Sequence, residues 1–275
     1  MERVVLITGA GTGIGLASAL EAARLGFYVV AAVHHESEED GVRKAVADAH
    51  LPAGAVEVEA LDVRDEARAR AVITAREPWG LVNNAAVVNA GLLVDVPVED
   101  ARDQFDVIAF APVRLAQLAI PAMGRGNGGR IVNVSSIAGD TTTPGLGWYQ
   151  AAKSTLSTLS SVMRQEVAHL GIEVVVVEPG IVDTDIWDHA ADDLRRRRDD
   201  ALDPAPYDQA IEATGAARAR GAGTDEVART VGTALHAGHP RFRYRVGTGA
   251  HVLPFVERVV PTGLRDRVTR AVGAL

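Results

Sequence analysis

The stretch VVLITGAGTGIG, Val4 to Gly15, decides how this chain folds. Its first five residues, VVLIT, are mostly β-branched and apolar, which predicts a short buried strand. The glycines at positions 9, 13 and 15 then open a helical pattern, because glycine allows a tight turn and a close approach of the backbone to a ligand. Such a turn can hold a pyrophosphate at the positive end of the helix. A plain strand-to-helix turn is the alternative, but the position at the first such junction of an alternating chain favours a cofactor site.

The rest of the chain continues to alternate short β-branched runs with longer helical patterns. The runs are apolar throughout, which is typical of a parallel sheet covered by helices on both faces. We therefore predict an α/β fold, a doubly wound seven-stranded parallel sheet of the Rossmann type in a single domain. The expected strands are residues 4–8, 28–33, 56–61, 80–83, 130–135, 173–178 and 244–247. The expected helices are residues 13–25, 38–49, 66–76, 99–123, 149–170 and 225–236.

The sequence shows no boundary between domains and no internal repeat. Residues 1–250 are expected to form the dinucleotide-binding domain, with a substrate lid at about residues 183–222. Within the lid, the block DDLRRRRDD predicts a solvated helix face with internal charge pairing. Residues 251–275 alternate apolar residues with Arg, which indicates a tail helix on the same domain or on a partner subunit. A membrane surface is a weaker alternative, because the tail has few anchoring aromatic residues.

Composition excludes several classes of function. The formal net charge of −8 argues against a nucleic-acid partner, because such binding needs many Lys and Arg side chains against phosphates. The chain has no cysteine, so it has no disulfide and no thiolate site, and we predict no metal site. The first residues lack the pattern of a signal peptide, and apolar runs such as residues 25–33 are shorter than the roughly 20 residues of a spanning helix. We therefore expect a cytoplasmic protein without an integral membrane segment.

The stretch WYQAAKS, Trp148 to Ser154, places a tyrosine four residues before a lysine. The chain has four tyrosines and two lysines, so a chance pair at this spacing is uncommon. Positions i and i+4 share a helix face, and Tyr149 and Lys153 can therefore converge on one point. A nearby ammonium lowers the pKa of the phenol from its usual value of about 10 toward the range in which it exchanges protons at neutral pH. A pair of exposed side chains at helical spacing is the alternative.

With this pair included, a set of short motifs resembles the short-chain dehydrogenases/reductases in order and spacing. The resemblance covers roughly residues 3–250, and the combination is much more specific than any single motif. The motifs are TGAGTGIG at 8–15, LDV at 61–63, NNA at 83–85, VSS at 134–136, YQAAK at 149–153 and PGIVDT at 179–184.

The resemblance implies a catalytic set. Tyr149 is then the acid or base, Lys153 lowers the pKa of the phenol and binds a ribose, and Ser136 orients the substrate oxygen. Without its two neighbours, Ser136 would be interpreted as a turn or capping serine. The adjacent Ser135 is expected to be structural.

The resemblance also implies a set of cofactor-binding residues. Asp62 and Val63 would flank the adenine, Asn84 the adjoining ribose, and Thr184 would hold the nicotinamide carboxamide, with a helix N-cap as its alternative role. The expected cofactor-binding residues are Gly9, Thr12, Gly13, Ile14, Gly15, His34, Asp62, Val63, Asn84, Ala85, Tyr149, Lys153, Pro179, Gly180, Val182 and Thr184.

The end of the second expected strand, YVVAAVHHES, bears on the choice between NADP and NAD. Folds of this type usually place a carboxylate there for the ribose 2′-OH of NAD, or a cation for the 2′-phosphate of NADP. His34 at this position favours NADP, whereas Glu36 and Glu38 favour NAD. A solvated loop is the alternative interpretation of His34 and His35.

Two positions depart from the family pattern. Ile108 stands where the resemblance implies an asparagine that helps to hold a water leading to the lysine, so we expect a less ordered helix kink and a reduced rate. Ala86 stands where a glycine is common, and its methyl group and restricted backbone bear on cofactor affinity.

The sequence therefore predicts an NAD(P)-dependent oxidoreductase that transfers a hydride between the cofactor and a secondary alcohol or carbonyl of a fairly apolar small molecule. Ile186 and Trp187 are candidates for the pocket wall. The alternative is a catalytically weakened sensor or scaffold with the same fold, consistent with Ile108 and Ala86. An epimerase or dehydratase would need a longer substrate domain. The resemblance also implies a homodimer or homotetramer.

Overall fold

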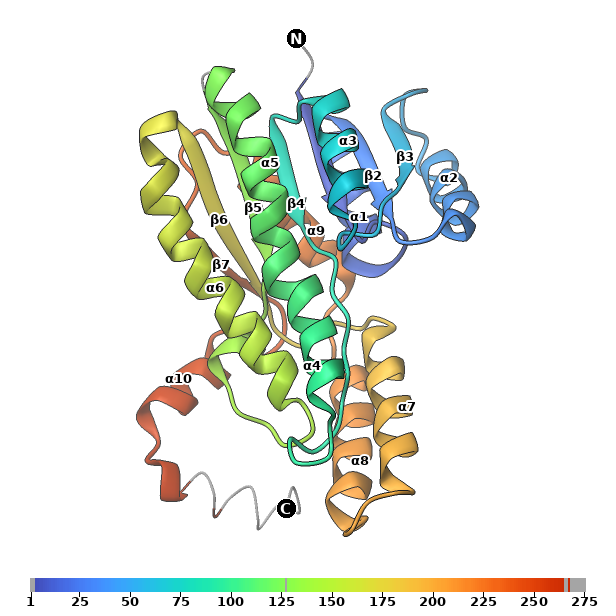
Figure 1. Ribbon diagram of the computed structural model, residues 1–275, viewed down its shortest axis with the longest axis vertical. Helices are drawn as coiled ribbons and strands as arrows, with labels where there is room; N and C mark the ends of the chain where they lie inside the picture. The colour runs from blue at the N-terminus through green and yellow to red at the C-terminus, as the bar shows by residue number, and fades with distance from the viewer. Residues whose placement is uncertain (1–2, 127, 265–266, 268–275) are drawn as a thin grey trace.

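The centre of the protein is a seven-stranded sheet in which all neighbouring strands are parallel, seen in the computed structural model of residues 3–126, 128–264 and 267 (Figure 1). The strand order is β3-β2-β1-β4-β5-β6-β7, so the order reverses between β1 and β4. The predicted fold class is therefore confirmed. The strands are β1 Val4–Thr8, β2 Tyr28–Val33, β3 Val56–Ala60, β4 Gly80–Asn83, β5 Gly129–Val134, β6 Ile172–Pro179 and β7 Arg243–Val246.

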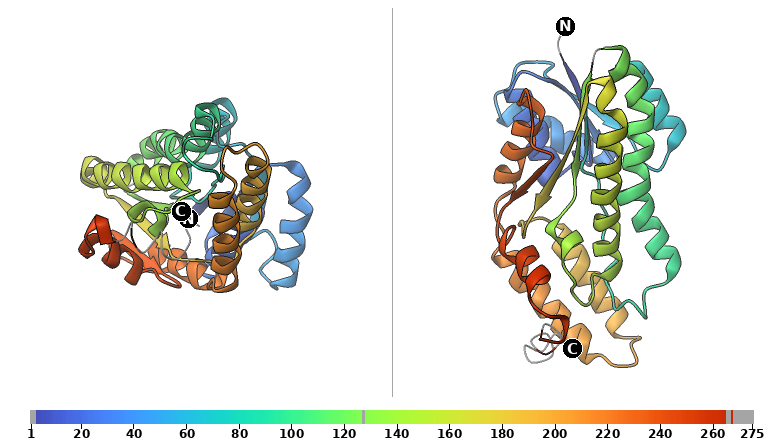
Figure 2. Two further views of the ribbon diagram at one scale, coloured as in Figure 1. Left: turned by 90° about the horizontal axis from the view of Figure 1, so that it is seen from below. Right: turned by 90° about the vertical axis from the view of Figure 1, so that its left-hand side faces the viewer.

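Helices cover both faces of the sheet (Figure 2). Successive side chains of a strand point to opposite faces, so Val5 and Ile7 of β1 belong to one core and Leu6 to the other. The first core contains α1 Gly13–Arg24, α2 Glu39–Asp48 and α9 Thr224–His236. The second contains α3 Glu66–Arg76, α5 Ala111–Arg125 and α6 Gly147–Val167. The continuously apolar strands follow from this burial on two sides.

The expected strand boundaries differ from the observed ones by no more than one residue. Two expected helices differ more: residues 149–170 form α6 Gly147–Val167 followed by a 3-10 turn, and residues 99–123 are not one regular α-helix. A π-helical turn, Asp106–Phe110, divides this segment into α4 Val98–Phe105 and α5. Short 3-10 turns, which the sequence did not predict, occur at Glu36–Glu38, Ile137–Asp140 and Ala168–Leu170.

The segment expected to form the lid contains two helices, α7 Ile186–Arg198 and α8 Ala205–Ala219. They lie side by side beyond the carboxyl ends of the strands (Figure 1). In the tail, α10 Val252–Val259 contacts the loop after β5, where Thr142 Oγ1 donates to Glu257 Oε1 at 2.6 Å. The expected tail helix extends to residues 265–266 and 268–275, which lie outside the described residues.

The continuous segment Val98–Arg125 is long and apolar enough to cross a membrane, judged by length and composition alone. Half of its most apolar window is buried against the rest of the domain, and the core helix of a soluble protein passes the same test. The packing of α5 against β4 and β5 accounts for that apolar composition.

The turn after β1 requires glycine for two reasons. Gly9 has φ of +63°, in the left-handed region, and a β-carbon there would lie 2.8 Å from the Cα of Ala85. The turn is therefore packed directly against the chain that follows β4, and no larger residue fits between them.

We expect Gly9→Ala to lower the free energy of unfolding by about 1–3 kcal/mol, because the new side chain meets both a strained backbone and the Ala85 backbone. Chemical denaturation followed by circular dichroism measures this. Gly41→Ala in α2 is the control, since its β-carbon meets open space and should stabilise the helix by up to about 1 kcal/mol. Equal effects of the two substitutions would contradict the proposed packing.

Candidate active site

The loops that follow β1, β4, β5 and β6 meet at one edge of the sheet and line a cavity of about 750 Å³. The carboxyl ends of parallel strands lie at the same edge, which explains why motifs distant in sequence meet here. Every residue expected to act in catalysis or cofactor binding lines this cavity. These residues are Gly9, Thr12, Gly13, Ile14, Gly15, His34, Asp62, Val63, Asn84, Ala85, Ser136, Tyr149, Lys153, Pro179, Gly180, Val182 and Thr184.

The glycine turn is held by the residues that follow β4. Thr8 Oγ1 accepts hydrogen bonds from the backbone N–H groups of Asn84 and Ala85 at 3.0 and 3.1 Å. The Asn84 side-chain amide donates to the carbonyl oxygens of Thr8 and Gly9 at 3.0 and 3.1 Å. Sequence reasoning placed Asn84 beside a ribose and overlooked Thr8. The structure gives both a role in shaping the turn.

The N-terminus of α1 faces the same cavity. Thr12 is the N-cap residue, but its side chain makes no capping hydrogen bond. The first N–H groups of the helix therefore have no side-chain cap, and they carry the partial positive charge of the helix end. A phosphate is the kind of group that such a position binds.

Ser136, Tyr149 and Lys153 come together as predicted from the sequence spacing. Ser136 is the N-cap of the 3-10 turn after β5; its Oγ accepts from Ala138 N at 3.1 Å and donates to the carbonyl oxygen of Pro179 at 3.4 Å. Its side chain also interacts with that of Tyr149. Lys153 lies one turn further along α6, with Nζ 5.7 Å from the centre of the Tyr149 ring. Its Nζ donates to the carbonyl oxygen of Val134 at 2.9 Å.

The sequence predicted that the ammonium lowers the pKa of the phenol, but burial has the largest effect and raises that pKa instead. Burial raises the pKa of Tyr149 to about 12, and the hydrogen bond with Ser136 opposes that change. Burial also lowers the pKa of Lys153 to about 8, since only 3% of the residue is exposed. At neutral pH the phenol is therefore protonated and the lysine mostly charged.

Ser135 is structural, as expected. Its buried hydroxyl donates to the carbonyl oxygen of Lys153 at 3.0 Å and lies 2.9 Å from the Ser157 hydroxyl. These bonds tie the end of β5 to the middle of α6. They fix the positions of Tyr149 and Lys153, along the axis of α6, relative to Ser136.

The two departures from the family pattern have simple structural settings. Ile108 is fully buried in the π-helical turn and does not line the cavity. In that turn Ala111 N donates to the carbonyl oxygen of Asp106, five residues earlier, so the kink forms without an asparagine side chain. Ala86 lines the cavity and has a negative φ, so glycine is not required there for backbone conformation.

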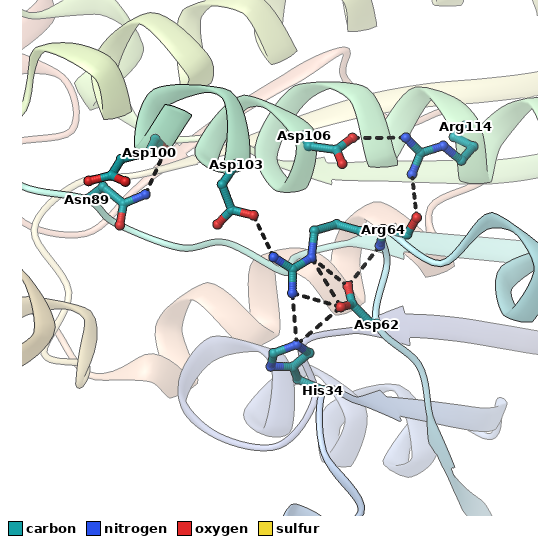
Figure 3. Close-up of polar contacts among 8 residues, drawn as sticks. All are labelled: His34, Asp62, Arg64, Asn89, Asp100, Asp103, Asp106 and Arg114. Carbon is teal, nitrogen blue, oxygen red and sulfur yellow. Dashed lines mark hydrogen bonds and ion pairs between the residues drawn. The ribbon is translucent and has the colours of Figure 1, made fainter. Parts of the chain in front are cut away.

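The adenosine end of the expected site is rich in charge, and Arg64 is a cavity residue that sequence reasoning missed (Figure 3). Its Nε and Nη2 donate to Asp62, and its Nη1 donates to Asp103 of α4 at 2.5 Å. His34 Nε2 lies 3.4 Å from Arg64 Nη2 and 3.5 Å from Asp62 Oδ2. The hydrogen bond from the Arg64 side chain lowers the pKa of Asp62 to about 2, although burial opposes it. The local motif LDVR gave no signal for this cluster, because Asp103 comes from a distant helix.

The far end of the cavity is walled by the helices of the expected lid. Both Ile186 and Trp187 line it, and Trp187 Nε1 donates to the carbonyl oxygen of Val182 at 2.7 Å. Polar His189 and Thr214 also line this wall, and small and apolar side chains form most of the rest. They include Val88, Leu146, Ala190, Leu194, Ala210, Ala213, Ala217 and Leu253.

Polar contacts attach the two lid helices to the loop after β4. The hydroxyl of buried Tyr207 donates to Asp95 at 2.7 Å, and Ala90 N donates to Asp193 Oδ2 at 3.0 Å. Arg197 pairs with Asp100 of α4.

The prediction that the DDLRRRRDD block pairs internally is therefore only partly right. Arg195 and Arg196 pair with Asp192 and Asp193 within the helix. Arg197 instead binds Asp100 of α4, and Arg198 pairs with Asp208 of α8 as well as with Asp199 inside the block.

The burial of Lys153 predicts a dependence of stability on pH. Its pKa falls from 10.5 in the unfolded chain to about 8 in the fold, so in this window the unfolded chain binds a proton that the folded protein has released. The contribution of Lys153 to the free energy of unfolding therefore increases as the pH rises above about 8, and it is smallest below that pH. The difference between wild type and Lys153→Met in urea denaturation should increase from pH 8 to pH 10. For Lys44→Met, at the exposed lysine of α2, that difference should stay flat, and a flat difference for Lys153 would contradict its burial.

Comparison with known proteins agrees with this geometry. The family described as short chain dehydrogenase matches residues 3–195. An uncharacterized oxidoreductase of Bacillus subtilis, YusZ, is 34% identical over 190 residues, which are 68% of this chain and 67% of that protein. The NADPH-dependent 3-dehydrocapnine reductase of Ornithobacterium rhinotracheale is 27% identical and aligns over 97% of this chain and 95% of its own length. The crystal structure of a short-chain dehydrogenase from Streptomyces avermitilis superposes with a TM-score of 0.77 at 27% identity, covering 98% of this chain and 95% of that one. The chain therefore belongs to the short-chain dehydrogenase family.

Proposed function

We propose that this oxidoreductase transfers a hydride between NADP(H) and a secondary alcohol or carbonyl of a neutral, mostly apolar small molecule. The observation that carries the proposal is the convergence of Ser136, Tyr149 and Lys153 on one cavity that also contains an uncapped helix N-terminus. One end of this cavity is charged and the other is apolar. That is the arrangement expected for a dinucleotide and an apolar substrate meeting in the middle.

The residues of the glycine turn fit a dinucleotide. A β-carbon at Gly15 would overlap the carbonyl oxygen of Gly9, and Gly13 has φ of +56°, in the left-handed region. Both positions at the start of α1 therefore suit glycine, which leaves the backbone of the turn uncovered by side chains there. We propose that the pyrophosphate binds at this turn, with Thr184 near the nicotinamide and Asp62 and Val63 near the adenine. NADP(H), when bound, would supply or accept the hydride.

In this proposal the proton is handled by the chain itself. Tyr149 is protonated at neutral pH and can donate to a carbonyl oxygen, or take the proton back from an alcohol. Ser136, whose hydroxyl donates to the Pro179 carbonyl oxygen at a long 3.4 Å, would turn to donate to the same oxygen as charge develops on it. Lys153 would stabilise the phenolate left after proton transfer, because its ammonium lies beside the ring.

The far end of the cavity supports a neutral substrate. Among the described lining residues numbered above 153, the ionisable side chains are Asp185 and His189, and none is Lys or Arg. A carboxylate or phosphate on the substrate would therefore find neither an ammonium nor a guanidinium there, and a single imidazole at most. We propose that residues 183–222 act as the lid over this end.

The choice of NADP is supported by two observations. The relative from Ornithobacterium rhinotracheale is named as NADPH-dependent. In this chain, His34 occupies the end of β2 beside the guanidinium of Arg64.

We also propose that the protein forms a homodimer or homotetramer. Phe110 is 54% exposed beside α5 and Val162 is 46% exposed on α6. A second copy packed on these helices would bury both side chains.

Tyr149→Phe tests the proposed reaction. Removing the hydroxyl should lower kcat/KM by about 10² to 10⁴ on a panel of neutral ketones and secondary alcohols, because the proton donor is lost. Turnover is followed at the nicotinamide absorbance band, and cofactor binding by fluorescence should persist. Tyr244→Phe on β7, outside the cavity lining, is the matched control. Unchanged turnover in Tyr149→Phe would refute the assignment, and cofactor binding without turnover by the wild type would support a sensor instead.

Ala213→Leu tests the assignment of the far end. The larger side chain, in the wall formed by α8, should raise KM for bulky apolar ketones by about 10-fold while leaving small ketones nearly unaffected. Ala219→Leu on the same helix does not face the cavity and should change neither value. An equal rise in KM for small and bulky ketones would place the substrate elsewhere.

A further inference from the structure

We infer that Glu38 and Arg64 have opposite effects on the preference between NADP and NAD. Glu38 disfavours the adenosine 2′-phosphate of NADP, whereas Arg64 favours it. This inference rests on the proposed function, since it concerns the adenosine end of the same cavity. Both residues line that end. The sequence pointed to Glu38 only as one of two glutamates near the strand end, and it gave no sign of Arg64.

Glu38 reaches back into the cavity from the 3-10 turn that follows β2. Its Oε2 accepts a hydrogen bond from the backbone N–H of His34 at 3.2 Å. Its carboxylate also lies against the glycine turn, because a β-carbon at Gly11 would overlap it. The carboxylate therefore occupies the space between the end of β2 and the turn that is expected to bind the pyrophosphate.

The ribose 2′ position of a dinucleotide lies at the end of the second strand in folds of this type. A carboxylate there accepts a hydrogen bond from the 2′-OH of NAD but repels the 2′-phosphate of NADP. Most such carboxylates are supplied by the strand end itself, where this chain has His34. Here Glu38 brings the carboxylate to the same place from four residues further along the chain.

Arg64 brings the opposite charge to the same end of the cavity (Figure 3). Two carboxylates, Asp62 and Asp103, orient its guanidinium beside His34. These partners raise the pKa of Arg64 further, so it stays charged at every working pH. An oriented guanidinium is well suited to a phosphate, since it offers several N–H donors in one plane.

A purely structural role is a weaker explanation for Arg64, because a neighbouring arginine already holds the loop after β3 in place. Arg114 of α5 donates to the carbonyl oxygens of Val63 and Arg64 at 3.2 and 3.4 Å and pairs with Asp106 (Figure 3). Arg114 thus ties the loop after β3 to the π turn and α5 without lining the cavity. Arg64 makes a second link and also presents its charge to the cavity.

The charges at this end of the cavity explain why Glu38 and Arg64 should have opposite effects on NADP binding. Asp62 and Asp103 each carry a negative charge against the single positive charge of Arg64, and Glu38 adds another negative charge. A bound 2′-phosphate would therefore depend on Arg64 and on displacement of the Glu38 carboxylate from His34 N. The relative affinity for NADP and NAD should change in opposite directions when one or the other residue is neutralised.

The test is calorimetric binding of NADP and NAD to the purified full chain, which needs no turnover. Glu38→Gln should raise the ratio of NADP affinity to NAD affinity by about 10-fold, and Arg64→Gln should lower it by about 10-fold. Arg64→Lys should recover part of the loss, since it restores the charge but not the planar donors. The double variant should return close to the wild-type ratio.

Matched controls separate this effect from a change in folding. Glu39→Gln and Arg68→Gln remove the same charges from residues that pair with Arg43 and Glu59 and do not line the cavity, so they should leave the ratio unchanged. The inference would be overturned if Glu38→Gln and Glu39→Gln had the same ratio of NADP affinity to NAD affinity. It would also be overturned if Arg64→Gln weakened the binding of both cofactors equally. Wild-type protein that binds neither dinucleotide would instead refute the proposed function itself.

Discussion

Hydrogen bonds between the ends of β1 and β4 join the two strands at which the order of the sheet reverses. Thr8 Oγ1 accepts from the backbone that follows β4, and the Asn84 amide donates back to the glycine turn. The turn, the start of α1 and the floor of the cavity are thereby fixed relative to one another. The loops after β5 and β6 reach the same edge because their strands are parallel to these two.

The proposed role of Tyr149 and Lys153 depends on burial as much as on their spacing. The spacing of Tyr149 and Lys153 along α6 brings the two side chains together, but the surrounding protein decides their protonation. Burial keeps the phenol protonated and makes the lysine a weaker base, and Ser136 partly opposes the change on the phenol. The Ser135 hydrogen bonds and the π turn hold these groups in place through backbone and core contacts. Their arrangement therefore tolerates Ile108 in place of an amide side chain.

Charge and apolar surface are segregated along the cavity. One end gathers His34, Glu38, Asp62, Arg64 and Asp103, whereas α7 and α8 surround the other end mainly with small apolar side chains. Tyr207, Asp193 and Arg197 attach α7 and α8 to the loop after β4, so the apolar end is connected to the same junction as the charged end. One scaffold can in this way place a charged ligand and an apolar ligand in contact.

The sequence by itself determined the seven strands, most of the core helices and the motif residues that line the cavity. Apolar periodicity and the order of short motifs are local properties, and a parallel sheet brings the motifs to one edge whatever the details of packing. Only the tertiary structure decided that Arg64 is held beside His34 by Asp103 of α4 and that Glu38 folds back onto the glycine turn. It also decided that a π turn divides the helix at Ile108 and that burial dominates the pKa of Tyr149. These features depend on partners that are distant in sequence and on the exclusion of water by neighbouring elements, which no local pattern encodes.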